Sequence, residues 1–180
     1  TVTWDVVGNN LDETVALASA TASNGFWLSN VNHAVYRDTT GCLRHESMND
    51  TDGIWHRDTA LSSCDPGFGG APGAASWAVG RLDVFWFSYF IIGPTRLSHA
   101  FYDGTWHYED LGATATAPVG APAVGSWGVG HLDVMWRDSV GDLRWRSFDR
   151  GKRGAAGYTG AGWATGVDVP PQAAARTRAR

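Results

Sequence analysis

The sequence contains a single lysine, Lys152, and only two cysteines, against 10 tryptophans and 23 glycines. Its formal net charge is −4, and because phosphate binding requires a basic field, this charge argues against a nucleic-acid partner. The longest apolar stretch, residues 84–92, is interrupted by Ser88 and falls short of the ~18 residues that cross a bilayer. We therefore expect neither a nucleic-acid ligand nor a membrane span.

Motifs that carry catalysis or hold metals are also missing. The sequence has no Gly-x-Ser-x-Gly elbow, no His-Glu-x-x-His motif and no phosphate loop. Its histidines lack metal-ligand spacing, and its cysteines lie in no CxxC or Cys/His pattern. We expect no catalytic residue, no metal and no cofactor, and we predict that the protein is not an enzyme.

The two cysteines, Cys42 and Cys64, lie near the open ends of one expected β-hairpin. A disulfide between them is geometrically possible, and two free thiols are the alternative. Because disulfides persist in oxidising compartments, a bridge would favour a secreted or extracellular protein.

An internal repeat decides the fold class. Residues 76–86 return at 126–136, an offset of 50 residues, and Trp27 stands one further offset before Trp77. The downstream segments also match, with an Asp-Gly-x-Trp-His sequence at both 52–56 and 103–107. Agreement at so many fixed offsets indicates a repeat architecture.

The pattern of each repeat unit predicts four short strands. A small-residue segment such as 121–127 is followed by a Gly-x-Gly turn, a second strand (132–137), a hairpin turn, a third strand (143–148) and a Trp-led fourth strand. Both faces of the second strand are largely apolar, as expected of a sheet that is sandwiched between neighbouring sheets. Four strands in about 40–50 residues are typical of a propeller blade. We predict an all-β fold, a β-propeller with four antiparallel strands in each blade, and expect residues 11–20 to be a strand or irregular segment rather than a helix.

The repeat units fall near 27–76, 77–126 and 127–165, with 1–26 as a partial blade and 166–180 as a basic tail rich in Ala, Arg and Pro. These units are fewer than the about 4–8 blades of a closed propeller. An open stack of sheets would expose large apolar faces, which soluble monomers avoid. We therefore expect the propeller to be incomplete in one chain, which is either a homo-oligomer subunit or a fragment of a larger propeller.

The repeated motifs are Ser-Trp-x-x-Gly-Arg/His-Leu-Asp-Val, then Gly-x-Leu, then Asp-Gly-x-Trp, with Glu-Asp-Leu-Gly at 109–112. Over residues 24–149 they resemble the Photorhabdus-type family of fucose-binding β-propeller lectins. The resemblance implies a seven-bladed ring with shallow sugar sites between adjacent blades. Two segments depart from the family pattern: an apolar insertion at 87–95, and residues 150–157, after which only Trp163 resumes the pattern.

The candidate ligand-binding residues recur in the repeat, which favours a multivalent binder over a single catalytic centre. The tryptophans of the turn are expected either to pack between blades or to stack on a sugar. Arg81 and His131 flank that turn and either donate to sugar hydroxyls or lie on solvated surface. We expect Asp83 and Asp133 to bond the backbone of a neighbouring strand rather than serve as glycosidase carboxylates. The full set of candidates is Trp77, Arg81, His99, Trp106, Trp127, His131, Trp136 and Trp145.

The sequence thus predicts a carbohydrate-binding lectin with several inter-blade sites for fucosylated or O-methylated glycans. An accessory or catalytic propeller of a glycoside hydrolase is the alternative, and a protein-interaction scaffold without a sugar site is a third hypothesis.

Overall fold

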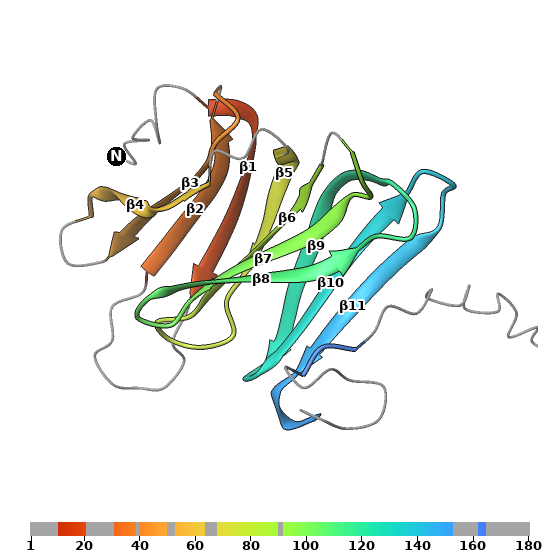
Figure 1. Cartoon of the computed structure of the whole chain (residues 1–180). Coiled ribbons are helices and arrows are strands. Elements are labelled where there is room, and N and C mark those ends of the chain that lie inside the picture. Colours follow the sequence, from red (N-terminus) through yellow and green to blue (C-terminus); the bar gives the residue numbers. More distant parts are fainter. Residues whose placement is uncertain are drawn as a thin grey trace, which may run out of the picture.

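A computed structural model of the chain describes residues 11–20, 31–38, 40–49, 53–63, 68–89, 92–152 and 162–164. The chain forms three antiparallel sheets in sequence order, with strand orders β1-β2-β3-β4, β5-β6-β7-β8 and β9-β10-β11 (Figure 1). The first sheet contains β1 (Leu11–Ala20), β2 (Val31–Asp38), β3 (Leu43–Asn49) and β4 (Trp55–Ser63). The second contains β5 (Phe68–Ala75), β6 (Leu82–Ser88), β7 (Arg96–Tyr102) and β8 (Trp106–Ala113). The third contains β9 (Pro118–Gly128), β10 (His131–Asp138) and β11 (Leu143–Asp149), followed by a short 3-10 turn, Arg150–Lys152.

The predicted all-β class and the four-strand unit are confirmed. In the second sheet Trp106 pairs with Tyr102 of β7. In the third sheet Trp163 forms the corresponding bridge with Phe148 of β11, so it holds the fourth-strand position. Residues 11–20 are a strand and not a helix. The sheets begin at residues 11, 68 and 118, whereas the predicted repeat units begin at 27, 77 and 127. Each sheet therefore starts one strand earlier in the chain than the corresponding repeat unit.

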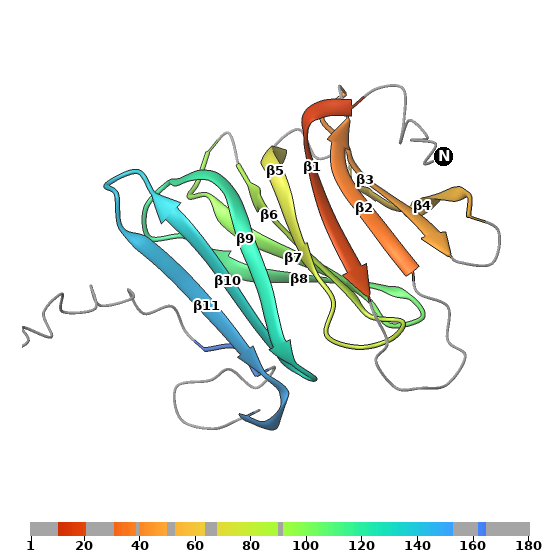
Figure 2. The same cartoon turned by 180° about the vertical axis from the view of Figure 1, so that it is seen from behind.

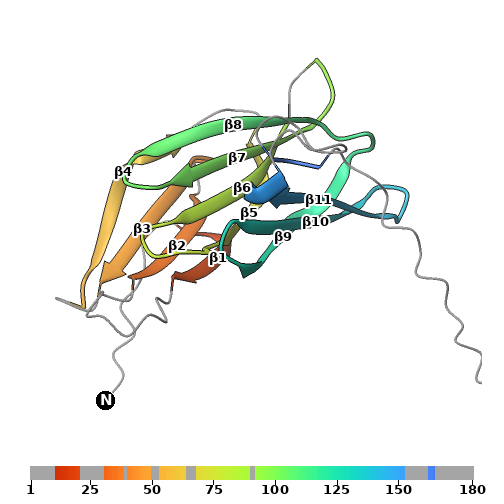
Figure 3. The same cartoon turned by 90° about the horizontal axis from the view of Figure 1, so that it is seen from below.

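The first strands of the second and third sheets, β5 and β9, are rich in glycine, alanine and proline because they approach each other closely. Strand β5 contacts both β1 and β9, and Figure 2 shows the three side by side through the middle of the molecule. A Cβ atom on Gly73 would collide with the Pro122 carbonyl oxygen and with Val124. The second, third and fourth strands fan outward from there (Figure 3).

Two apolar layers hold the three sheets face to face. Leu82, Val84 and Trp86 of β6 pack toward the first sheet, against Val35, Leu43 and Leu61. The opposite face of β6 carries Phe85 and Phe87, which pack against Leu132, Val134 and Trp136 of β10. Every residue of β6 is consequently buried. In β10 the residues of the outer face, such as Met135 and Arg137, are exposed, because the described residues place no fourth sheet there.

Aspartates close the second hairpin of the first and third sheets in the same way. Asp138 Oδ1 accepts the backbone N–H groups of Val140 and Asp142 at 3.1 and 2.8 Å, and Arg144 Nε donates to Oδ2 at 2.8 Å. Asp38 takes this role in the first sheet, with Thr40, Cys42 and Arg44 as its donors. In the second sheet the insertion predicted at 87–95 replaces this turn, and its Ile92 is 93% exposed.

Cys42 is disulfide-bonded, and the sequence holds just one other cysteine, Cys64, which lies outside the described residues. Trp27 and the predicted tail at 166–180 also lie outside them. Among the elements that the structure describes, no helix has the length and apolar character needed to span a bilayer.

Candidate functional site

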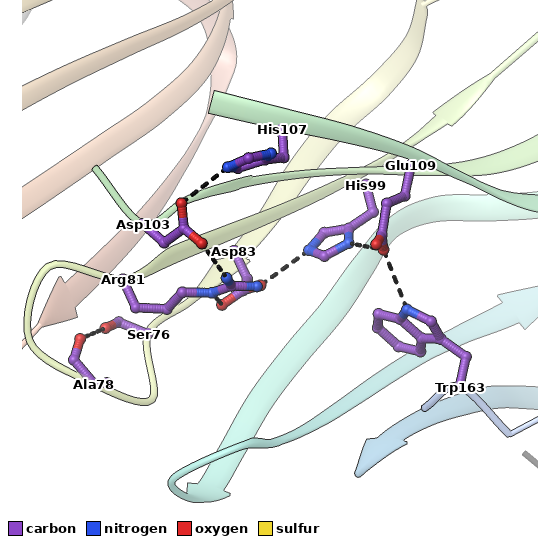
Figure 4. Close-up of polar contacts among 9 residues, drawn as sticks. All are labelled: Ser76, Ala78, Arg81, Asp83, His99, Asp103, His107, Glu109 and Trp163. Atoms are coloured by element: carbon purple, nitrogen blue, oxygen red, sulfur yellow. Dashed lines mark hydrogen bonds and ion pairs between the residues drawn. The ribbon is translucent and has the colours of Figure 1, made fainter. Parts of the chain in front are cut away.

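A cavity of about 320 Å³ lies between the second and third sheets. The β5–β6 turn and strands β7 and β8 contribute one wall, and residues of the third sheet contribute the other. Its lining includes Trp77, Arg81, His99, Glu109, Phe148 and Trp163. Figure 4 shows the polar side chains of this region converging from β6, β7, β8 and the segment that carries Trp163.

The β5–β6 turn explains the repeated Ser-Trp-x-x-Gly motif. Ser76 Oγ donates to the Ala78 carbonyl oxygen at 3.0 Å, and the Arg81 N–H donates to the same oxygen at 3.2 Å. Gly80 has φ = 68°, a left-handed conformation that glycine adopts without a Cβ penalty. The turn therefore delivers Trp77 and Arg81 to the mouth of the cavity.

Arg81 is fixed by ionic and aromatic contacts. Its Nε and Nη2 donate to the two carboxylate oxygens of Asp83 at 2.9 and 2.6 Å, a bidentate geometry that suits a guanidinium. The guanidinium carbon lies 3.9 Å from the ring centroid of Phe101 and 5.0 Å from that of Trp77. The expectation that Asp83 bonds a neighbouring backbone was wrong: the adjacent arginine and the facing His99 on β7 satisfy its carboxylate through side chains.

His99 lies between two carboxylates in the buried wall of the cavity. Its Nε2 is 3.0 Å from Asp83 Oδ1, and its Nδ1 is 3.0 Å from Glu109 Oε2. Trp163 Nε1 donates to the same Glu109 oxygen at 3.3 Å. The hydrogen bond from His99 lowers the pKa of Glu109 more than burial raises it, so Glu109 is ionised at neutral pH.

The cavity opens toward a polar rim. Asp103 accepts from His107 Nε2 at 2.9 Å, and the His107 ring stacks on Phe101 with centroids 4.7 Å apart. Asp103 Oδ2 also lies 3.8 Å from Arg81 Nη1 (Figure 4). Both Asp103 and His107 are about half exposed, so these groups can meet the distal part of a ligand.

The site combines groups that recognise polyhydroxylated molecules. Arg81 supplies fixed donors, Glu109 supplies an acceptor, and the indoles supply apolar surfaces. The Trp77 Nε1–H group is buried and has no acceptor among the described residues. A buried donor without a partner costs free energy, and a ligand oxygen in the cavity would remove that cost.

A related but altered arrangement lies between the first and second sheets. His45 holds the register position of His99, and Trp106 meets its ring edge-on with centroids 5.3 Å apart. The His99–Trp163 pair has the same geometry, at 5.5 Å. His33 takes the place of Asp83, and its Nδ1 is 2.9 Å from His45 Nε2. This boundary thus repeats the imidazole and the indole and replaces the carboxylate of Asp83 with His33, while Asp58 holds the register position of Glu109.

On the outer face of the third sheet, Trp127 and His131 occupy the positions that Trp77 and Arg81 occupy in the second sheet. The ring of His131 stacks on Trp127 with centroids 3.8 Å apart, as Arg81 covers Trp77, and His131 lies 3.8 Å from Asp149. Trp127 is 70% exposed. A hollow beside it is lined by Ala123, Gly125, Asp133 and Met135, on the face that has no neighbouring sheet among the described residues.

Comparisons with known proteins identify the architecture. No protein-family model matches the sequence, and no curated protein matches it. Solved structures of a mutant Aleuria aurantia lectin, in complex with α-methyl-L-fucoside and with Fucα1-6GlcNAc, match with a TM-score of 0.59 at 20% identity, over 87% of this chain. The chain thus has a β-propeller fold. The three sheets are therefore blades, and the chain spans 45% of the length of the Aleuria lectin chain.

The predicted site residues divide among these blade boundaries. Trp77, Arg81 and His99 meet in the cavity between the second and third blades, while Trp106 lies at the boundary between the first and second. Trp127 and His131 form the half-site on the open face. Trp136 is 6% exposed in the apolar layer, a packing position. Trp145, on β11 opposite Met135, is half-buried on the open face.

Two residues of the cavity, Glu109 and Trp163, were not among the sequence-based candidates. Glu109 stands in the Glu-Asp-Leu-Gly segment, but only its register opposite His99 shows that the two residues are neighbours. The repeat pattern resumes at Trp163, and the bridge to Phe148 identifies this residue as the third copy of the fourth-strand tryptophan. That recurrence is the signal that could have placed it among the candidates.

Proposed function

We propose that the chain is a non-enzymatic carbohydrate-binding unit that holds a sugar in the cavity between the second and third blades. The observation that carries this proposal is the convergence of Arg81, Glu109 and two indoles on one partly enclosed cavity. In this arrangement Arg81 and Glu109 bond sugar hydroxyls, and Trp77 or Trp163 contacts the apolar C–H face of the ring. The unpartnered indole N–H of Trp77 donates to a further ligand oxygen.

Fucose-type sugars are the favoured ligands. The Aleuria lectin structures contain an α-fucoside and a fucosylated N-acetylglucosamine, and the repeated motifs resemble those of the Photorhabdus-type lectins. The candidate partners are therefore fucosylated or O-methylated glycans on a cell surface or a secreted glycoconjugate. Cys42 is disulfide-bonded, and this supports a secreted or extracellular location.

The three boundaries are chemically unequal, so one chain offers one complete sugar site. The first boundary has histidine where the complete site has Asp83, and the part of the chain that the structure describes supplies no second wall to the open face. Affinity for a glycosylated surface then comes from several chains acting together. A homo-oligomer would supply this valency, since two copies of a chain that spans 45% of the Aleuria lectin would match about nine-tenths of its length.

The glycosidase alternative requires two carboxylates that flank a glycosidic bond. Asp83 is completely buried and is bonded to both Arg81 and His99, so it has no access to a substrate. This observation favours binding over hydrolysis.

A glycan array followed by calorimetry with α-methyl-L-fucoside tests the proposal. We expect fucosylated glycans to be retained and a stoichiometry of about one sugar for each chain. Release of chromophore from aryl glycosides would favour the hydrolase instead. A protein that folds but retains no glycan on the array would favour the interaction scaffold.

A further inference from the structure

His99 contacts two carboxylates on opposite sides of the proposed sugar site, Asp83 and Glu109. Its ring is 2% exposed and stacks on Phe85 with centroids 4.2 Å apart and planes inclined by 6°. One ring nitrogen faces Asp83, which holds Arg81, and the other faces Glu109. The two charged groups assigned to sugar recognition are therefore connected through a single imidazole.

The chemistry of these contacts specifies a protonation state. A neutral imidazole has one N–H donor and one acceptor nitrogen, whereas an ionised carboxylate only accepts. A neutral His99 would therefore turn a lone pair toward either Asp83 or Glu109. An imidazolium donates to both, and a buried position makes such charge-assisted bonds strong.

We infer that His99 is a positioning residue for the sugar site, and that as an imidazolium it holds Glu109 and the Asp83–Arg81 pair in the geometry that binds the ligand. This inference rests on the proposed function, because Arg81 and Glu109 are assigned to the sugar there. His99 lies behind these groups and acts on the ligand through them.

The charges around His99 favour this state. The second blade contributes Arg81, Asp83 and Glu109 to its surroundings, and Asp103 lies further out in the same cavity. The third blade contributes Arg150 to the cavity lining and the neutral indole of Trp163 to the ring edge. The two carboxylates in direct contact outweigh the arginines, which do not bond the ring.

The equivalent histidine at the first blade boundary, His45, allows the packing contacts of His99 to be compared with its ionic contacts. His45 keeps the edge-on indole contact, but its neighbour across the strand pair is His33 instead of a carboxylate. Burial and the nearby His45 lower the pKa of His33 to about 4, so His33 is neutral at pH 7. An imidazole–indole contact is thus common to both boundaries. The aspartate at the Asp83 position belongs to the second boundary, and His33 replaces it at the first, where Asp58 holds the register position of Glu109.

Nitrogen NMR of the ligand-free protein, with ¹⁵N in the histidine rings, reads the state of His99 directly. We expect both ring nitrogens to carry protons at pH 7, with the signal assigned through His99→Phe. A single neutral tautomer at pH 7 would overturn the inference.

Affinity measurements on variants test positioning against packing. His99→Phe keeps an aromatic ring against Phe85 and Trp163 but removes both N–H donors, and we expect roughly 10-fold or weaker binding of α-methyl-L-fucoside. His56→Phe changes an exposed histidine of β4 and serves as the matched control, with unchanged affinity expected. Unaltered affinity in a folded His99→Phe protein would show that the ring only packs.

A double-mutant cycle with Glu109→Gln completes the test. If His99 acts through Glu109, the effects of the two substitutions are less than additive; full additivity would contradict the inference. A variant that does not fold is identified by its melting curve, and the NMR measurement on the unmodified protein then decides. Failure of the unmodified protein to bind any glycan would refute the proposed function, whereas the state of His99 would still be readable in the ligand-free protein.

Discussion

Arg81 Nη2 lies 2.6 Å from Asp83 Oδ1, and the Asp83 side chain is completely buried while the Arg81 side chain is 12% exposed. From the sequence, Arg81 is either a donor to sugar hydroxyls or a solvated residue beside a turn, and substitutions at such surface positions change stability by only ~0.5 kcal/mol. In the folded protein the arginine neutralises a buried carboxylate. It therefore contributes to both stability and ligand binding.

Replacing Arg81 with alanine should abolish sugar binding and also destabilise the fold. The change leaves Asp83 buried with His99 as its remaining ionic partner, and we expect a loss on the order of 3 kcal/mol in the free energy of unfolding. Arg96→Ala is the matched control, because it breaks an exposed pair with Asp110 that solvent screens, so we expect a much smaller loss of stability. Urea denaturation measures both values, and equal losses in the two variants would contradict this account.

Two tryptophans of neighbouring repeats, Trp77 and Trp136, should respond in opposite ways. Trp136 is buried between the second and third blades, so Trp136→Ala should cost about 3–5 kcal/mol of stability. Trp77→Phe keeps an aromatic ring at the cavity but removes the buried N–H, and it should weaken sugar binding roughly 5-fold or more with little loss of stability. Calorimetry and thermal melting separate the two effects. Weakened stability without weakened binding in Trp77→Phe would assign Trp77 to packing.

Much of the fold could be predicted from the sequence because the same pattern of strands and turns recurs in each repeat unit. The turn after the first strand needs Ser76 and Gly80, and the hairpin turn needs Asp138, so these residues recur at fixed offsets. The cavity was harder to predict because it depends on contacts between blades. Glu109 and Trp163 are 54 residues apart, and nothing in either local sequence indicates that they meet. Repetition alone also could not distinguish packing from binding, since Trp136 recurs with Trp86 but is buried in the apolar layer between two blades.

The turn aspartate Asp138 should make the fold sensitive to acid. Hydrogen bonds from Thr116, Arg144 and the turn backbone hold its pKa well below the ordinary value, although burial opposes them. A carboxyl group with a depressed pKa stabilises the fold above its unfolded-state pKa near 4, and this contribution is lost as the pH falls further. Melting temperatures from pH 7 to pH 2 should therefore drop more steeply in the unmodified protein than in Asp138→Asn. Parallel curves would contradict the prediction.

The His33–His45 pair should add a second, higher pH window. The pKa of His33 is lowered to about 4, first by burial and then by His45, so the unfolded chain binds more protons between about pH 6.5 and pH 4. Stability is present above that window and declines through it as the pH falls, by on the order of 2 kcal/mol. His33→Gln should flatten this decline in urea denaturation. An unchanged slope would show that His33 does not titrate in this way.

The most direct test of the central claim is an NMR titration of the tryptophan indole N–H signals with α-methyl-L-fucoside. The account predicts saturable shifts for Trp77 and Trp163, at the boundary between the second and third blades, while the buried Trp136 and the first-boundary Trp106 stay unchanged. Trp→Phe variants assign the signals. Saturable shifts at Trp106 or Trp127 without any at Trp77 or Trp163, or no shift at millimolar sugar, would contradict the claim that this cavity is the sugar site.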